Sequence, residues 1–392
     1  MYKNLLLSLL LIAANAVSSS QAQEKYSNLH VGFVYPVSSN GKEAAQYTNK
    51  VSLHALSGVS YAEEAASFVG LISKVKTNVT GVHIAGLSYL VGDRTAGFLF
   101  SGLLNKYTQG QGTQIAGLVN LSKKEVTGIQ FAGLVNQAGK LEGAQFAGIG
   151  NKIDSNVRGQ QFAGILNTTA NVNGAQFAGI LNLAKDTLKG IQFAGIANKA
   201  NHVKGSQFAG IVNKAKKVSG IQFAGIVNIA DSSDYPIAIL NFIKNGEKSI
   251  GFSIDEQANT LATFRSGGRI MYGILGLGYN LKNEKEIYAL QAGIGAHLFS
   301  GNKFGLNIEA TNIVLESFKK GEFFKNSLTL MPTYKIDKRL DIFAGASINY
   351  LSTNTQEGRE LTKKFIHTWD GKSENSFQGI FVGGTVGLKL RL

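Results

Sequence analysis

The sequence predicts an all-β protein, an antiparallel transmembrane β-barrel of about 22 strands built largely from 15–16-residue repeats. Three observations lead to this fold class. A short apolar phrase recurs at a fixed period through nearly half of the chain. The composition is rich in Gly (47 residues) and poor in Pro (3 residues), which suits strands. Long segments near the C-terminus alternate apolar residues with small or polar ones.

The N-terminus has the parts of a secretory signal peptide. Lys3 supplies positive charge, residues 5–17 form a short apolar stretch, and residues 20–22 (SQA) offer a cleavage site of small residues. We therefore expect residues 1–22 to be removed and the mature chain to begin near Gln23. No later stretch has ~18 uninterrupted apolar residues, so the sequence predicts no transmembrane helix.

The repeat is clearest in "GIQFAGIAN" at 190–198, with near copies at 174–182, 205–213 and 220–228. A polar link follows each apolar phrase, which predicts one strand and one turn per unit. Glycine inside every unit argues against a helix. The Phe of the unit, or the Ile or Leu in its place, recurs every 15 or 16 residues at Leu53, Phe68, Ile84, Phe100, Ile115, Phe131, Phe146, Phe162, Phe177, Phe193, Phe208 and Phe223.

Two β architectures fit this repeat. Alternation puts Phe193 on one strand face and Gln192 with Asn198 on the other. A parallel solenoid would stack Asn198 on Asn182 and Asn213, and this amide ladder explains why the Gln and Asn positions hardly vary. An antiparallel meander would keep Asn182 and Asn198 apart, and it explains a two-unit period. The residue after the first Gly of each unit shows that period at Ile129, Ala144, Gln160, Ala175, Ile191, Ser206 and Ile221.

The C-terminal part of the chain favours the antiparallel barrel. The Asn-Gly pair at 245–246, between two strand patterns, is the strongest short hairpin signal. Segments 286–299 and 377–392 each place large apolar side chains on one face and small or polar ones on the other. This is the pattern of a membrane-spanning β-strand, with the apolar face toward lipid. In the last strand it assigns Leu388 to the lipid face and Thr385 to the lumen.

Loop lengths agree with an even number of strands. The longest connections, 37–49 and 352–376, both follow odd-numbered strands, as expected for a barrel with short periplasmic turns and long outer loops. The chain then divides into the signal peptide at 1–22, a repeat-built β-strand region at 23–246 and C-terminal barrel strands at 247–392. The second long loop carries the only Trp, which makes it the best candidate for an external contact.

The sequence predicts no catalytic, cofactor-binding or metal site. The chain has no Cys, which excludes disulfides and thiol nucleophiles. The net charge of +14 is dispersed, with no run of Lys or Arg longer than two residues, so nucleic-acid binding is not expected. No GxSxG or HExxH motif occurs. The histidines lack metal-ligand spacing, and a hydrogen-bonded lumen residue is the expected role of His297. The six are His30, His54, His83, His202, His297 and His367.

These motifs resemble a known family. The repeat GxQFAGIxN, preceded by "VGFVYPVSSNG" (31–41) and "NKVSLHALSGVS" (49–60) and closed by "YPIAILNFIKNG" (235–246), is similar to the surface-repeat outer-membrane proteins of Gram-negative bacteria. The resemblance covers most of the mature chain. It implies a location in the cell envelope and a β-rich structure, and it supplies no activity.

The sequence therefore predicts an outer-membrane barrel with a passive pore or a structural scaffold role and no covalent chemistry. Its expected partners are the lipid bilayer of the outer membrane and, during biogenesis, the barrel-assembly machinery. Two alternatives remain. The first is a surface-displayed β-solenoid adhesin or structural module on a small eight-stranded barrel. The second is an outer-membrane enzyme such as an acyl hydrolase, which would need a Ser/His pair that no motif of the sequence indicates.

Overall fold

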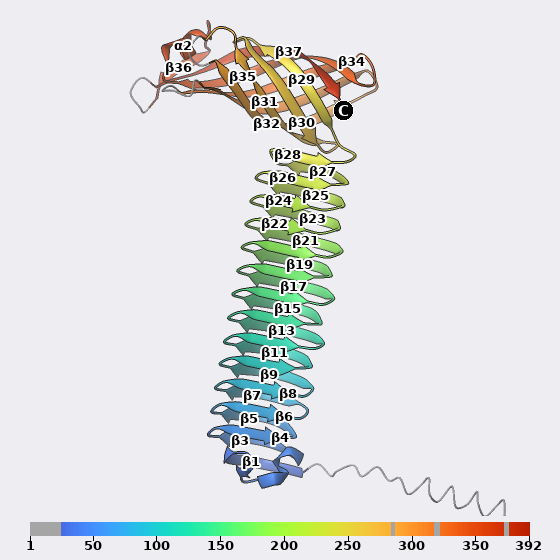
Figure 1. Cartoon of the computed structure of the whole chain (residues 1–392), viewed down its shortest axis with the longest axis vertical. Coiled ribbons are helices and arrows are strands. Elements are labelled where there is room, and N and C mark those ends of the chain that lie inside the picture. The colour runs from blue at the N-terminus through green and yellow to red at the C-terminus, as the bar shows by residue number, and fades with distance from the viewer. Residues whose placement is uncertain (1–24, 284–286, 317–321, 372–375) are drawn as a thin grey trace, which may run out of the picture. The chain divides into compact units, whose positions relative to one another are not determined.

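The computed structural model describes residues 25–283, 287–316, 322–371 and 376–392. The expected signal peptide at 1–22 lies outside these residues. The described chain is built almost entirely of strands (Figure 1). It divides into two compact units, 1–133 and 134–392, and this boundary falls within the repeat at 128–136.

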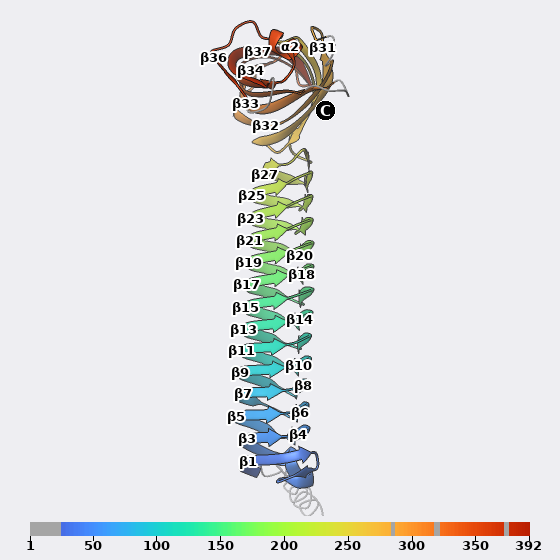
Figure 2. The ribbon, with the colours of Figure 1, turned by 90° about the vertical axis from the view of Figure 1, so that its left-hand side faces the viewer.

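The repeats form a parallel β-solenoid of about 13 turns. Each coil consists of a long strand and a short strand, and the two kinds lie in two different sheets (Figure 2). In the first unit the long strands are β1 (Lys25–Val34), β3 (Tyr47–His54), β5 (Ala62–Val69), β7 (Val79–Ala85), β9 (Arg94–Ser101), β11 (Gln109–Ala116) and β13 (Glu125–Ala132). The short strands are β4 (Ser57–Ser60), β6 (Ile72–Val75), β8 (Ser88–Val91), β10 (Leu104–Tyr107) and β12 (Val119–Ser122).

The second unit continues the same pattern. Its long strands are β15 (Lys140–Ala147), β17 (Asn156–Ala163), β19 (Asn171–Ala178), β21 (Thr187–Ala194), β23 (His202–Ala209), β25 (Lys217–Ala224) and β27 (Ser232–Ile237). Its short strands are β14 (Val135–Ala138), β16 (Gly150–Ile153), β18 (Leu166–Thr169), β20 (Leu181–Ala184), β22 (Ala197–Lys199), β24 (Val212–Lys214), β26 (Val227–Ala230) and β28 (Leu240–Ile243).

The register of these strands contradicts the single antiparallel barrel of about 22 strands. Gln192 pairs with Gln207 and Phe193 with Phe208, both in parallel strands. Asn198 is likewise the direct partner of Asn182 in a parallel pair, where the barrel would have kept them apart. The alternation that favoured a meander lies at outward positions such as Ile191, which is 39% exposed. These side chains are free to vary, so their period carries no information on strand direction.

The invariant amides form the interior of the solenoid, between the two sheets. Gln192 and Asn198 are fully buried, together with Leu188, Val203 and Ala200. The glycine that opens the repeat is also required by this stacking. Gly190 has a φ of 132°, and a Cβ there would lie 1.9 Å from the carbonyl oxygen of Gly174 in the preceding coil.

The start of the solenoid differs from the expectation for residues 37–49. The segment is not an outer loop of a barrel. It contains β2 (Val37–Ser38), which pairs antiparallel with β1, and the 3₁₀ helix η1 (Gly41–Gln46), and it leads into β3. The connection folds beside the first coil because β1 and β3 are neighbours in one parallel sheet.

The C-terminal strands form a closed antiparallel barrel of eight strands. The alternative prediction, a solenoid carried on a small eight-stranded barrel, expected this part of the fold. The strands are β29 (Lys248–Asp255), β30 (Asn259–Gly267), β31 (Met271–Asn280), β32 (Tyr288–Ser300), β33 (Phe304–Glu316), β34 (Phe323–Lys335), β35 (Leu340–Thr353) and β37 (Phe377–Arg391). Pairing of β29 with β37 closes the sheet. Between β35 and β37 lie the short helix α2 (Gln356–Glu360) and β36 (His367–Asp370), which pairs with β37.

The hairpin expected at Asn245-Gly246 is wrong. These residues connect the last solenoid strand, β28, to the first barrel strand, β29, and the two strands do not pair. Instead β28 pairs with β26, while β29 pairs with β30 and β37. The turn residues therefore mark the change from parallel coils to antiparallel barrel.

Candidate functional site: the barrel wall and the hollow beside the last coils

Ion pairs fill the interior of the barrel. Arg265 donates two hydrogen bonds to Glu309, at 2.8 and 3.0 Å, and both side chains are almost completely buried. Lys325 is 2% exposed and pairs with Asp255 and with Glu256. The hollow left among these groups is only about 40 Å³. An eight-stranded barrel is just wide enough for side chains to fill it, and these side chains do so.

The expected lumen position of His297 is confirmed. Its Nδ1 lies 2.7 Å from Asn307 Oδ1, and its Nε2 lies 2.6 Å from Glu247 Oε2. Lys389 also reaches Glu247, at 3.0 Å. The ring is a member of the interior polar network, and no described residues form a group of three or more ligands that could hold a metal ion.

The outer wall of the barrel is apolar. In the last strand Leu388 points outward and is 44% exposed, while Thr385 borders the interior hollow, as the alternation predicted. The same division holds in β32, where Leu290 and Ile294 are exposed and Gln291 borders the interior. The barrel strands other than β30 contribute large exposed apolar side chains, among them Phe252, Ile254, Leu277, Leu290, Ile294, Phe304, Leu328, Leu330, Ile342, Ile348, Val382, Val386, Leu388 and Leu390.

The two ends of the barrel differ in the length of their connections. At the end where the chain enters β29, the connections are the short segments 268–270, 301–303 and 336–339. The connections at the other end are 256–258, 281–287, 317–322 and 354–376, the last of which contains α2 and β36 (Figure 1). One end therefore carries only tight turns, and the solenoid joins the barrel at that end.

The last coil is tied to the β30–β31 turn by polar contacts. Asn241 donates from its backbone nitrogen to Ser266 Oγ at 3.0 Å and from its side chain to the carbonyl oxygen of Ser266 at 3.3 Å. Arg269 in the turn pairs with Asp234 at 3.1 Å. The backbone nitrogen of Ile270 donates to the carbonyl oxygen of Asp234. These contacts fix the last coil against this end of the barrel.

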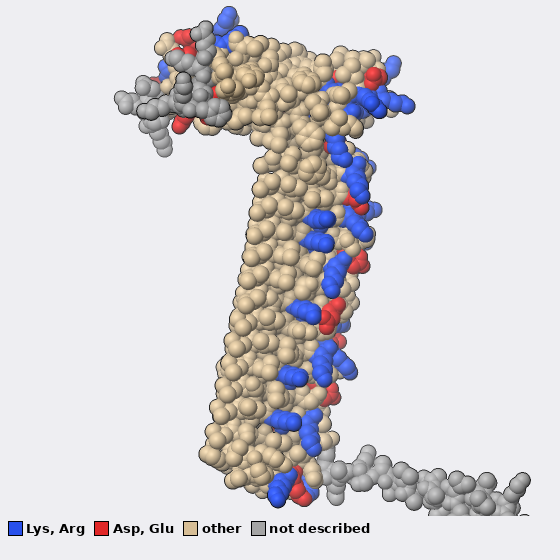
Figure 3. Space-filling model, viewed as in Figure 1, with Lys and Arg blue, Asp and Glu red and all other residues tan. Residues whose placement is uncertain are grey.

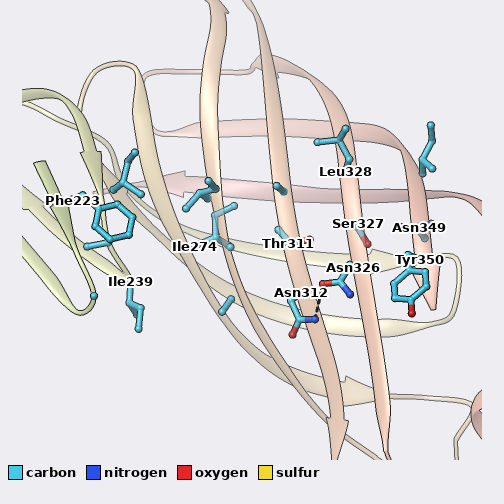
Figure 4. Close-up of a pocket in the computed structure, with 18 of the residues that line it drawn as sticks. Phe223, Ile239, Ile274, Thr311, Asn312, Asn326, Ser327, Leu328, Asn349 and Tyr350 are labelled. Carbon is cyan, nitrogen blue, oxygen red and sulfur yellow. Dashed lines mark hydrogen bonds between the residues drawn. The ribbon is translucent and has the colours of Figure 1, made fainter. Parts of the chain in front are cut away.

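A hollow of about 700 Å³ lies beside this junction, between the last coils and the outer wall (Figure 4). The coils contribute Phe223 and Ile239, and the wall contributes Leu328 and Ile348. The lining is predominantly apolar. Its polar members include the side chains of Asn312 and Asn326, which are hydrogen-bonded to each other at 3.0 Å.

The coil surface that reaches this hollow is a ladder of apolar side chains, which we call the apolar edge. It consists of the repeat Phe on the outer face of each long strand and the Ile in the turn that follows. Successive Phe rings stack with centroids 4.6–5.5 Å apart from Phe146 to Phe208. In the second unit the apolar edge comprises Phe146, Ile149, Phe162, Ile165, Phe177, Ile180, Phe193, Ile196, Phe208, Ile211, Phe223, Ile226 and Ile239.

Part of the loop expected to make an external contact, 352–376, packs against the barrel. Trp369 in β36 donates from Nε1 to Gln378 Oε1 at 2.6 Å, and its ring stacks on Tyr350 with centroids 6.0 Å apart. Thr355 caps α2 by accepting a hydrogen bond from the backbone nitrogen of Gly358. Whether this loop meets a partner stays a prediction.

A buried polar cluster in the first coils was not predicted from the sequence. Glu63 accepts hydrogen bonds from Ser52 Oγ at 2.8 Å and from Asn49 Nδ2 at 3.2 Å. Burial raises the pKa of the Glu63 carboxyl to about 7, against the smaller opposing effect of these donors. Burial and the neighbouring His54 lower the pKa of His30 to about 4. The rings of His30 and His54 meet edge to face, with centroids 4.4 Å apart.

Other sequence signals could have located part of the barrel site and the coil surface. The interior ion pairs use residues on the small or polar face of the strands, so a charge on that face was a usable signal. The outward position of the repeat Phe was indicated by the near-invariance of Gln and Asn, because a buried amide must keep its partners. The hollow depends on how the last coil meets the barrel, and no local pattern encodes that.

No helix among the described residues is both long and apolar enough to cross a membrane. No family model, curated protein or solved structure matches the chain.

Proposed function

We propose that this chain is an outer-membrane protein in which the eight-stranded barrel is a closed membrane anchor and the solenoid is a structural module carried on the periplasmic side. The observation that supports it most is the division of the barrel residues. Apolar side chains such as Leu388 and Val386 point outward around the closed sheet, and charged ones such as Arg265 and Lys325 point inward. This is the arrangement of a lipid-facing wall around a polar interior.

The packed interior supports an anchor over a pore. The pairs Arg265–Glu309 and Lys325–Asp255 cross the space that a channel would need, and the remaining hollow of about 40 Å³ is little larger than one water molecule. A passive pore, which the sequence suggested as one role, has no comparable support. The chain also offers no described cluster of catalytic groups in an open cleft, so we do not propose an enzyme.

The periplasmic placement of the solenoid is supported by the barrel turns. In outer-membrane barrels the short turns lie in the periplasm and the longer loops outside. The coils precede β29 and contact the β30–β31 turn, so they lie at the tight-turn end. The alternative of a surface-displayed adhesin needs the opposite orientation of the barrel, with 354–376 in the periplasm.

Two measurements on cells test this proposal. The protein should be found in the outer-membrane fraction and should migrate differently on gels before and after heating, as closed barrels do. Orientation can be read with single cysteines, because the natural chain has none. A membrane-impermeant maleimide should label Lys364→Cys on intact cells and should label Lys199→Cys only after the outer membrane is permeabilised. Labelling of Lys199→Cys on intact cells would instead support surface display, and recovery without detergent from the periplasm would reject the anchor.

A further inference from the structure

We propose that the apolar edge of the second-unit coils is a membrane-docking surface, which inserts between the lipids of the leaflet that surrounds the barrel. The partner of the apolar edge is therefore the acyl chains of these lipids. This inference rests on the proposed function, since it assigns to the coils the same bilayer that the barrel is proposed to cross. It adds that the second-unit coils contact the membrane along the apolar edge, rather than projecting free of it.

The apolar edge and the outer wall of the barrel adjoin each other at the hollow. The hollow beside the junction is bounded by Phe223, Ile237 and Ile239 of the coils and by Ile294 and Leu328 of the outer wall (Figure 4). Lipid that covers the wall at Ile294 therefore also meets the start of the apolar edge. Lipid acyl chains can cover both surfaces without interruption, because no charged side chain among the described residues lines the hollow between them.

The backbone in the turns of the apolar edge is already hydrogen-bonded within the protein. A segment can enter hydrocarbon only if its N–H and C=O groups have partners within the protein. In the turns that carry the Ile ladder, the backbone nitrogen of Gly195 donates to Ala178 O at 3.2 Å. That of Val212 donates to Ile196 O at 2.9 Å. Each coil satisfies the turn of its neighbour, so the edge presents side chains and no unpaired amide donors at these positions.

Charged side chains are distributed unevenly around the second-unit coils. Lys, Arg, Asp and Glu gather along one side of the coils and leave the apolar edge free of charge (Figure 3). On the long strands, the cations Arg158, Lys189 and Lys204 each lie four residues before the repeat Phe, or about 13 Å along the strand. On the short strands, exposed lysines follow the turn Ile by three residues, or about 10 Å, at Lys152, Lys199 and Lys214.

This spacing suits a membrane interface. An amphipathic element at a bilayer surface buries its apolar face roughly 5–10 Å into the boundary between headgroups and acyl chains. Cations about 10–13 Å from that face reach the level of the lipid phosphates, where long Lys and Arg side chains are favourable. The coils of Phe193 and Phe208 carry cations at both positions, so the apolar edge is flanked on two sides there. The coils of Phe146 and Phe162 carry one such cation each, and in the coil of Phe146 the long-strand position holds Glu142. The feature that selects lipid over a protein partner is this pairing of an uncharged edge with flanking cations.

The test uses the full-length protein in vesicles of phosphatidylethanolamine and phosphatidylglycerol with brominated acyl chains. Single cysteines carry a fluorophore that bromine quenches on contact. Phe193→Cys and Ile211→Cys probe the apolar edge, and Lys217→Cys, an exposed position at the opposite end of a long strand, is the matched solenoid control. Val386→Cys probes the outer wall of the barrel away from the coils.

We expect at least a roughly twofold loss of emission in brominated vesicles at 193, 211 and 386, as for groups that lie among acyl chains, and no loss at 217. Quenching at 386 alone would overturn the inference and leave the proposed function intact. Absence of quenching at all four positions would reject the membrane anchor itself. Labels at 193 and 211 that are shielded from an aqueous quencher and unaffected by bromine would identify a second copy of this chain on the edge, which also overturns the inference.

Discussion

The side chain of Asn198 donates a hydrogen bond to Asn213 Oδ1 at 3.0 Å and another to the carbonyl oxygen of Phe208 at 2.6 Å. The same pair of bonds recurs one coil earlier, where Asn182 donates to Asn198 Oδ1 and to the carbonyl oxygen of Phe193. Each Asn thus joins its own short strand to the short strand and the long strand of the next coil. This role accounts for the near-invariance of the residue through the repeat.

Replacing one ladder member should therefore open the solenoid locally. Asn198→Ala removes the side-chain donor to the carbonyl oxygen of Phe208 and to Asn213 Oδ1, and it removes one acceptor of the Asn182 side chain, all in a buried site. We expect a local loss of about 2–4 kcal/mol, the cost of several unpaired buried polar groups. Hydrogen exchange at the amides of β21 to β24 measures this loss. The exposed neighbour Lys199→Ala is the control, and equal protection in both variants would contradict the ladder argument.

The parallel register predicts crosslinks that an antiparallel meander forbids. Lys199 and Lys214 are exposed register partners in β22 and β24. Cysteines at these two positions should have Cα atoms about 4.8 Å apart, within the range that a disulfide tolerates. We expect efficient oxidation to an intramolecular disulfide, read as a gel shift reversed by reductant. A cysteine pair at 189 and 199, on the two different sheets of one coil, should not crosslink.

The sequence predicted the repeat, its period and its strands, yet the expected strand direction was wrong. The near-invariance of Gln192 and Asn198 within the repeat indicated a ladder of stacked amides. The structure contains this ladder, so the cause inferred for the near-invariance is confirmed. The competing observations, the alternation at Ile191 and the Asn-Gly pair at 245–246, were local patterns whose meaning depends on burial and on the next element. A side chain that faces solvent varies for many reasons, so its period is weak evidence on topology.

The buried cluster in the first coils gives a pH dependence with a defined sign. The pKa of Glu63 rises from its ordinary 4.5 to about 7, so the folded state binds this proton more tightly than the unfolded state does. The stability from Glu63 is therefore full below pH 4.5 and is lost as the pH rises to about 7. The depressed pKa of His30 acts in the opposite sense, because its contribution grows from about pH 4 to 6.5. Burial also lowers the pKa values of His54 and His83.

Glu63→Gln should remove one of these opposing contributions. Relative to the natural chain, the variant should gain stability between pH 5 and 8, by up to about 3 kcal/mol for a shift of this size. The stability of its first coils should then rise monotonically through the range where the histidines titrate. Hydrogen exchange at the amides of β3 and β5, followed against pH, provides the measurement. A difference between the two proteins that does not change with pH would show that Glu63 is ionised in the folded state.

The filled interior predicts that the barrel does not conduct. Arg265 with Glu309, and Lys325 with Asp255, occupy the centre of the lumen as buried ion pairs. If either partner moved away, a buried charge would be left uncompensated, which is strongly unfavourable. The ion pairs therefore hold these side chains in place. We expect no discrete single-channel currents after reconstitution into planar bilayers, with a known porin as the positive control. Reproducible ohmic steps from the purified protein would show an open path and would favour the passive pore.

The barrel faces were predicted more accurately than the coils, because a strand with one apolar and one polar face shows both environments in strict alternation along its sequence. Leu388 and Thr385 were assigned to opposite sides from the sequence alone, and the structure places them so. The partners inside the barrel were not predictable in the same way. Arg265 and Glu309 lie on strands that are not neighbours in the sheet, so their pairing requires the closed barrel to exist first.

The assignment of the two faces leads to a sharp comparison in the last strand. Leu388→Arg places a cation on the apolar outer wall, and in a transmembrane barrel this costs about 2–4 kcal/mol near the bilayer midplane. Thr385→Arg points toward the interior, where the carboxylates of Asp255 and Glu256 line the same hollow. We expect Leu388→Arg to lower the yield of folded, heat-modifiable protein in the membrane fraction and Thr385→Arg to lower it less.

This comparison separates lipid contact from simple crowding. Arg is larger than Thr and must displace neighbours in a packed interior, so steric cost alone would make the Thr385 variant the worse of the two. Only an apolar surrounding outside the barrel makes the change at Leu388 more harmful. Folding each variant by dilution from urea into lipid vesicles and into detergent micelles measures the difference directly. We expect the gap between them to be larger in vesicles, since micelles let a charged side chain reach water more easily. A gap between the two variants that has the same size in vesicles and in micelles would argue against a bilayer around Leu388.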